Sequence, residues 1–389
     1  MRRYSAFFLL LLLLSCLDPY DPDLPPSAND LIVIDGFVDA GRATAVVKIQ
    51  RSLSLEKNGP FPMIRHANVT IIASDGSQNT LHENSPGLYE AKNIHTGRDY
   101  QYTLHVLTTD GGEYFSDPQR VYDTPPIDSI TTAIAITGDD LSFRVNTHNP
   151  QSESFFYTWD YVETFEYTAP MYSGWIKTPS GPRTRLPEEN IYTCWKTTQS
   201  TKVLIGSTRG LSANVVRNFE LLSIPRGSLK LSTRYSLLVK QRVIDEDEYN
   251  YLSLIRKTTE SIGGLFDPLP APVHGNMHSS DDVSQPVLGY FRAGKVEEKR
   301  FFIRFEELPE YFQILPYDEC ETFPACSRPA VIPANGPAPT CVPFEDVPDF
   351  WPLIEVVQSG PTSYSGTYTS ERCGDCRARG GVTRRPDFW

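Results

Sequence analysis

Short stretches of β-branched residues, several of them alternating apolar and polar positions, begin after residue 30 and predict β-strands joined by tight turns. Three of them are LIVIDGFVDA (31–40), ATAVVKIQRS (43–52) and ANVTIIASDGS (67–77), which ends in an Asp75-Gly76 hairpin turn. The pattern continues to Ser116 through a second turn at Asp110 to Gly112. Short strands at this spacing, without a helical stretch, predict a β-sandwich over residues 30–124.

A second group of strands follows Pro125-Pro126, a pair that suits neither a central strand nor a helix. Opening strands are predicted in residues 127–170, an irregular insert runs from 162 to 200, and later strands lie in residues 202–244. Together they predict a second sandwich within residues 125–305. The first sandwich resembles transthyretin-like or carboxypeptidase-regulatory-like domains, and the second resembles a fibronectin type III domain.

One segment has helical rather than strand periodicity. Asp245 occupies an N-cap position, Glu248 has capping-box spacing, and apolar residues then recur on one helical face. This predicts a capped helix over residues 246–262, and the helix dipole accounts for the acidic residues at its start. The expected fold class is mainly β, with tandem β-sandwiches, one helix and a disulfide-rich C-terminal region over residues 306–389.

The N-terminal segment has the features of a lipoprotein leader. Arg2 and Arg3 precede an apolar run, Phe7 to Leu14, that is too short to span a bilayer. Leu13-Leu14-Ser15-Cys16 resembles the bacterial lipobox, so residues 1–15 are expected to be a signal peptide and Cys16 the acylated residue. Residues 16–29 are rich in Pro and Asp and predict an extended tether. The expected location is the outer membrane, lipid-anchored and facing the cell exterior.

Six further cysteines are expected to form structural disulfides, because disulfides persist outside the cytoplasm. They are Cys194, Cys320, Cys326, Cys341, Cys373 and Cys376. Their pairing stays open, although we expect Cys194 to be linked to the C-terminal region. The Cys373-Gly-Asp-Cys376 motif could also be a redox pair or half of a metal site. Gly380-Gly381 and Pro386 disfavour the helix that a thioredoxin-like motif needs, and no second pair has zinc-ligand spacing.

Charge and motifs narrow the function. The formal net charge of −12 disfavours nucleic acids and anionic membrane surfaces as partners. The sequence contains no GxSxG, HExxH, GxGxxG or P-loop motif. His274 and His278 are four residues apart, but Pro272 and Gly275 argue against a zinc-binding helix there. We therefore expect a binding or accessory protein rather than an enzyme, with no cofactor and no metal.

Two motifs carry a family resemblance, Gly289-Tyr290-Phe291 and the C-terminal pattern CxDCR…GG…PxFW. With the lipobox and the early sandwich, they resemble a family of Bacteroidota lipoproteins described as a domain of unknown function. The resemblance implies genes that lie beside those of TonB-dependent receptors, and hence an accessory or substrate-capture partner of such an outer-membrane β-barrel. The alternative is a stand-alone adhesin or glycan-binding lipoprotein. The expected partner contacts are Tyr172, Trp175 and Trp195 in the insert, since aromatic residues contribute strongly to interfaces.

Overall fold

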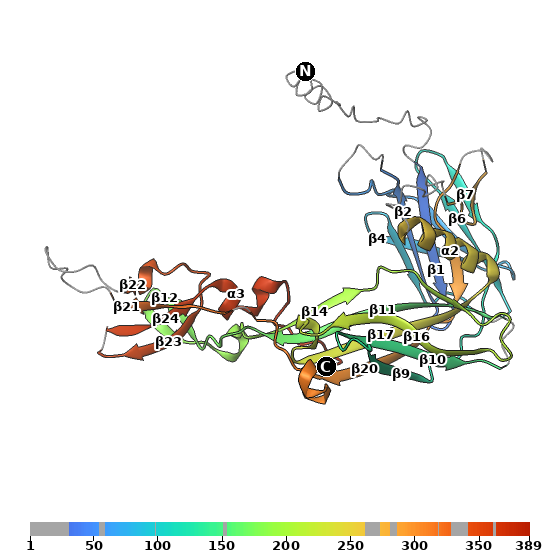
Figure 1. Ribbon diagram of the computed structural model, residues 1–389. Helices are drawn as coiled ribbons and strands as arrows, with labels where there is room; N and C mark the ends of the chain where they lie inside the picture. The colour runs from blue at the N-terminus through green and yellow to red at the C-terminus, as the bar shows by residue number, and fades with distance from the viewer. Residues whose placement is uncertain are drawn as a thin grey trace, which may run out of the picture.

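The computed structural model describes residues 31–53, 59–97, 99–150, 154–260, 273–280, 286–317, 319–327, 341–360 and 363–389. Within these ranges the chain forms two β-sandwiches and a third, smaller sheet (Figure 1). The mainly β fold predicted from the sequence is confirmed. The expected signal peptide, Cys16 and the tether lie outside the described residues, and so do the last two residues of the predicted helix, 261–262.

The first sandwich is a ten-stranded sheet that folds over a single core. Its order is β18-β7-β6-β3-β4-β5-β2-β1-β19, with β8 paired to β6. Alternate residues of several strands point inward, as the sequence pattern predicted, and Ile34, Val47, Ile71 and Leu104 are among those that are fully buried. The strands are β1 (Ile32–Asp39), β2 (Thr44–Arg51), β3 (Asn68–Ala73), β4 (Gln78–Ser85), β5 (Leu88–Lys92), β6 (Gln101–Leu107), β7 (Glu113–Ser116), β8 (Gln119–Arg120), β18 (Met277–Ser279) and β19 (Phe291–Gly294).

Two strands of this sheet correct the predicted domain boundaries. The sequence pattern placed residues 125–305 together in the second sandwich. In the structure β18 pairs antiparallel with β7, and β19 pairs parallel with β1. Phe291 of β19 is fully buried in the first core. The chain therefore returns to the first sandwich before it finishes the second.

The second sandwich consists of two sheets that share one core. One sheet has the order β16-β10-β9, and the other has the order β14-β11-β17-β20, with β15 also paired to β11. Phe143, Trp159 and Tyr235 are fully buried between them. The strands are β9 (Ser129–Ile134), β10 (Asp140–His148), β11 (Phe156–Thr168), β14 (Thr193–Gln199), β15 (Leu204–Ser207), β16 (Val215–Pro225), β17 (Arg234–Ile244) and β20 (Glu297–Arg304).

Helix α2 (Glu246–Glu260) lies between the two sandwiches, and the predicted N-cap is confirmed. The carboxylate of Asp245 accepts a hydrogen bond of 2.7 Å from the backbone N–H of Glu248. Tyr249 contacts Phe156 of the second sandwich at 4.7 Å between ring centroids. Tyr251 contacts Tyr290 beside the first sandwich at the same centroid separation. The helix therefore joins the two sandwiches.

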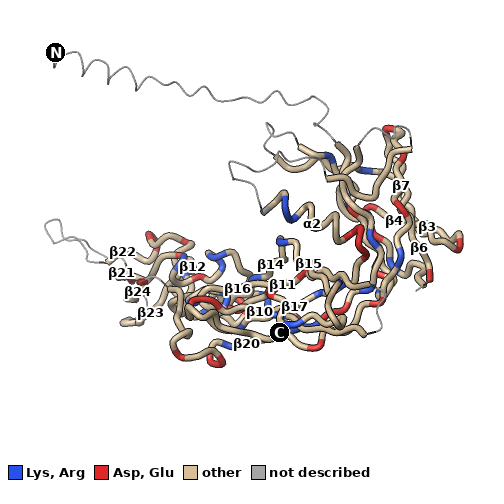
Figure 2. The backbone as a smooth tube through the Cα atoms, turned by 45° about the vertical axis from the view of Figure 1, so that its right-hand side comes forward, with Lys and Arg blue, Asp and Glu red and all other residues tan. Residues whose placement is uncertain are grey.

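The third sheet, which we call the distal sheet, lies at the end of the second sandwich away from the first (Figures 1 and 2). Its order is β13-β12-β23-β24-β21-β22. The 162–200 insert was expected to be irregular. This expectation is corrected, because segments of the insert and of the C-terminal region combine into this sheet. Its strands are β12 (Trp175–Thr178), β13 (Gly181–Thr184), β21 (Thr322–Cys326), β22 (Val342–Pro343), β23 (Leu353–Gln358) and β24 (Tyr364–Thr369).

Short helices complete the connections. They are α3 (Glu371–Gly374), η3 (Pro187–Glu189), η4 (Leu229–Leu231), η5 (Phe305–Glu307), η6 (Glu310–Phe312), η7 (Phe344–Asp346) and η8 (Cys376–Arg379). No helix in the described part of the chain is both long and apolar enough to cross a membrane.

Candidate ligand cleft between the two sandwiches

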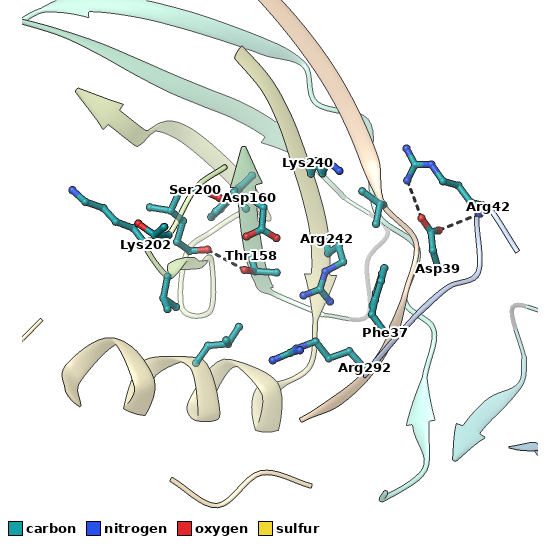
Figure 3. Close-up of a pocket in the computed structure, with 16 residues that line it drawn as sticks. Phe37, Asp39, Arg42, Thr158, Asp160, Ser200, Lys202, Lys240, Arg242 and Arg292 are labelled. Carbon is teal, nitrogen blue, oxygen red and sulfur yellow. Dashed lines mark hydrogen bonds and ion pairs between the residues drawn. The ribbon is translucent and has the colours of Figure 1, made fainter. Parts of the chain in front are cut away.

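A cleft of about 510 Å³ lies where the two sandwiches and helix α2 meet (Figure 3). Strand β1 contributes Phe37 and Asp39, and β17 contributes Lys240 and Arg242. The remaining walls come from the 200–204 segment, α2 and the β19 region. Ligand sites are common at such junctions between domains.

A buried ion-pair group lies beside this cleft and contributes Arg242 and Arg292 to its wall. Glu248 of α2 is 4% exposed, and its Oε1 lies 2.9 Å from Nη2 of Arg242 and 3.1 Å from Nε of Arg292. Burial lowers the pKa of Arg242, but the charge of Glu248 and its hydrogen bond, together with the charges of Asp160 and Asp39, outweigh burial, so the pKa is raised. The Arg242 guanidinium therefore stays charged beside this carboxylate. The helix dipole alone does not account for the acidic start of α2, because Glu248 joins α2 to β17 and β19.

The remaining charges of the cleft are largely paired. Arg42 lies 2.8 Å from Asp39 and 2.8 Å from Glu298, and Lys240 lies 3.4 Å from Glu298. The lining carries five basic and two acidic side chains, and Glu248 and Glu298 beside it reduce the net charge to about +1. The cleft is thus polar with a small positive excess, which suits a hydrogen-bonding ligand better than a highly charged one.

The lining does not assemble a nucleophile with its base. None of the lining residues is a histidine, and the hydroxyl of Thr158 donates to the carbonyl of Leu204 at 3.1 Å. Within the described ranges, no group of three or more His, Cys, Asp or Glu is placed to hold a metal ion. The arrangement of this cleft can bind and orient a polar molecule.

The three aromatic residues predicted as partner contacts do not form one site. Tyr172 is 64% exposed and touches Tyr192 edge-on at 5.3 Å. Trp175 is in β12 and packs against the core of the distal sheet. Trp195 is in β14, where its backbone exchanges hydrogen bonds with Val382. Of the three, Tyr172 offers the most surface to a partner.

All six predicted disulfide cysteines are paired, in the bonds Cys194–Cys376, Cys320–Cys373 and Cys326–Cys341. The expected link from Cys194 to the C-terminal region is present. The two cysteines of the CxxC motif bond to different partners. Cys376 is tied to β14 of the second sandwich, and Cys373 to the segment that enters the distal sheet. The motif therefore fastens the distal sheet to the second sandwich.

The cleft itself was not predicted. Lys240 and Arg242 give a weak signal, since these two basic residues follow the apolar run LLV in the strand RYSLLVKQRVI. Their partners Glu298 and Glu248 lie in other elements, so the sequence alone does not connect them.

Comparison with known proteins assigns the chain to a family. No curated protein matches it. Among solved structures, it is similar to the interferon gamma receptor alpha chain of chicken, with 10% sequence identity over 55% of this chain and 89% of that chain. The TM-score is 0.15, so this likeness carries no argument about fold or function. Residues 17–300 match a family model described as "Domain of unknown function (DUF4249)", and the chain therefore belongs to the DUF4249 family.

Proposed function

We propose that the protein is a surface-exposed outer-membrane lipoprotein that serves a TonB-dependent transporter as a non-enzymatic accessory or substrate-capture partner. The lipobox at Cys16, the acidic Pro-rich tether and the resemblance to Bacteroidota lipoproteins support this location at the outer membrane. An anchored protein of this kind needs a surface that reaches its partner and a site that holds a ligand.

The observation that carries the proposal is the exposed apolar surface at the distal sheet and its connections. Tyr172 and Phe350 are 64% and 62% exposed, and Leu186 and Val357 are also exposed. Exposed apolar side chains on a rigid body favour protein contacts. The distal sheet lies at the end of the molecule opposite the first sandwich, which directly follows the tether in the sequence (Figure 1).

The attachment of the distal sheet is suited to docking. Besides the two disulfides of the CxxC motif, the hydroxyl of Tyr167 donates to the carbonyl of Cys376 at 2.9 Å, and that of Tyr317 to the carbonyl of Thr168 at 2.9 Å. A surface fixed in this way loses little conformational entropy on binding. The polar cleft between the sandwiches then provides a place for a captured ligand.

Crosslinking in intact cells tests the partnership. A photoreactive residue at Tyr172 or at Phe350 should capture a TonB-dependent receptor, identified by mass spectrometry. The same residue at Phe61, an exposed aromatic position between β2 and β3 of the first sandwich, should not. If neither distal position captures a receptor and the protein purifies alone from membranes, the accessory role is wrong, and the adhesin alternative takes its place.

The anchor has its own test. The Cys16→Ser variant should lose acylation and move to the soluble fraction, because the proposal attributes membrane attachment to lipid on this residue. A variant that remains with membranes after a salt wash would contradict the lipoprotein assignment without bearing on the distal surface.

A further inference from the structure

A second cavity, of about 650 Å³, lies on the other side of the junction, between the start of α2 and the first sandwich. Its walls come from the segment that links β7 to β8, from the first turns of α2, and from the segments just before β18 and β19. In Figure 2 acidic residues gather at the beginning of α2, next to the first sandwich. We call this the acidic cavity.

The charge of the acidic cavity is one-sided. Asp117, Asp245 and Asp247 line it, and its lining contains no Lys or Arg. His278 lies 3.0 Å from Asp117, and both side chains are more than half exposed. The nearby Arg292 is already engaged by Glu248. Unlike the cleft on the other side, this cavity therefore keeps an excess of negative charge.

A tyrosine at the cavity wall provides an independent sign of a ligand. Tyr290 lines the cavity and is only 3% exposed, yet its hydroxyl has no hydrogen-bond partner among the described residues. This hydroxyl is not one of the fully enclosed polar atoms, so it opens onto the cavity, where it can bond a bound molecule. Burial and the charges of Asp245, Glu248 and Asp247 raise the pKa of Tyr290, so the phenol remains a neutral donor and acceptor.

The wall that carries Tyr290 is rigid. The side-chain amide of Asn276 donates to the carbonyl of Phe291 at 2.8 Å and accepts from its backbone N–H at 2.8 Å. A Cβ on Gly275 would lie 1.6 Å from the carbonyl oxygen of Gly289, so only glycine allows this close approach. The site is thus formed before any ligand arrives.

The shape and chemistry favour an organic cation over a metal ion. Within the described part of the chain, the carboxylates do not converge into a group that could ligate a metal. The cavity is large enough for a small molecule, and the rings of Tyr251 and Tyr290 provide aromatic faces beside the carboxylates. Aromatic faces with nearby carboxylates are the typical environment for an ammonium or guanidinium group.

We propose that the acidic cavity binds a small organic cation, with Asp245 and Asp247 facing its ammonium or guanidinium group and the hydroxyl of Tyr290 accepting a hydrogen bond from it. Asp117 completes the negative wall from the first sandwich. This site shares no residue with the exposed apolar surface at the distal sheet, so it can be correct whether or not a transporter is the partner.

Calorimetric titration of the purified full-length protein with 1,4-diaminobutane, with arginine amide and with tetramethylammonium tests the proposal. We expect saturable binding of at least one of these cations and none of 1,4-butanediol, the uncharged match of the diamine. Asp247→Asn should weaken binding about tenfold, the loss of one charge-assisted contact. Tyr290→Phe removes only the hydroxyl, and should weaken binding of the cations that carry N–H donors but not of tetramethylammonium.

Glu246→Gln is the matched control, because it removes the same charge from the neighbouring position of α2 without lining the acidic cavity. It should leave the affinity within about twofold of the original, since an exposed charge contributes little. The proposal is wrong if none of the three cations binds at about 10 mM, if calcium ions bind and the organic cations do not, or if Glu246→Gln weakens binding as much as Asp247→Asn.

Discussion

Glu248 holds two guanidinium groups, one from each sandwich, with almost no access to water. Removing one member of a buried ion pair leaves the other charges without compensation, which typically costs about 3–5 kcal/mol. We expect Glu248→Gln to lower the free energy of unfolding by roughly 3 kcal/mol in urea titrations. The control is Glu246→Gln, whose partner Arg209 is exposed, and which should cost less than about 1 kcal/mol. Equal effects of the two substitutions would contradict the importance of the buried group.

Gly289, in the motif that carries the family resemblance, has a structural role. Its φ is +98°, and a Cβ there would lie 2.2 Å from the carbonyl oxygen of Ile34. Gly289→Ala should therefore destabilise the first sandwich by roughly 3 kcal/mol or more, because strain and a backbone clash add together. Gly76 has a similar φ of +85° with open space around it, so Gly76→Ala should cost only about 1 kcal/mol. The free energy of unfolding of each variant, measured thermally or chemically, separates the two effects. Gly76→Ala reports the cost of the positive φ alone, and the further loss in Gly289→Ala reports the cost of the backbone clash.

At the scale of elements, the disulfides should differ in what they stabilise. The Cys194–Cys376 bond closes a separation of 182 residues, and the Cys326–Cys341 bond one of 15 residues within the distal sheet region. Closing loops of these lengths restricts the unfolded chain, which stabilises the folded state by about 5 kcal/mol for the longer loop and about 3 kcal/mol for the shorter one. We expect the Cys194→Ser/Cys376→Ser variant to increase amide exchange in both β14 and η8, the two elements that the bond joins. The Cys326→Ser/Cys341→Ser variant should increase exchange in the distal sheet alone.

The elements that could be predicted from the sequence are those with a local signal. The strands of the first sandwich alternate clearly, and Asp245 marks the start of α2. Strands β18 and β19 have only three and four residues, so no periodicity identifies them, and their partners are far away in the sequence. The distal sheet was missed for a related reason. It combines a hairpin from residues 175–184 with strands after residue 320, and long-range pairing leaves no local pattern.

At the scale of the whole molecule, the two cavities at the junction could not be predicted from the sequence either, because they too depend on contacts between distant segments. Phe37, Arg242 and Arg292 approach one another only because the chain returns from the second sandwich to the first. The residue types can be read from the sequence, but their proximity in space cannot be predicted from it. The partner contacts were predicted from aromatic composition, which does not distinguish an exposed ring such as Tyr172 from a packed one such as Trp175.

The stability of the whole molecule should fall at alkaline pH. Burial raises the pKa of Tyr157 and of Tyr251 to about 12, whereas tyrosines in an unfolded chain ionise near pH 10. Between these values the unfolded state binds fewer protons than the folded state, so the free energy of unfolding decreases as the pH rises. Urea midpoints should therefore be constant up to about pH 9 and decline from pH 10 to 12.

Tyr251→Phe provides the control for this pH dependence. The hydroxyl of Tyr251 has no hydrogen-bond partner among the described residues, so its removal leaves the packing intact. The variant should lose less stability than the original protein between pH 10 and 12. An unchanged slope would show that Tyr251 does not contribute to the alkaline loss.

The return of the chain to the first sandwich has a consequence for biosynthesis. Strand β19 is made after β17, and β20, the last strand of the second sandwich, is made after β19. A nascent chain that has not reached residue 291 therefore holds two unfinished sandwiches, because the first still lacks Phe291 in its core and the second lacks β20. Synthesis that stops before this point leaves neither sandwich complete, so chaperones and proteases would recognise the truncated product over both halves and not over the second alone.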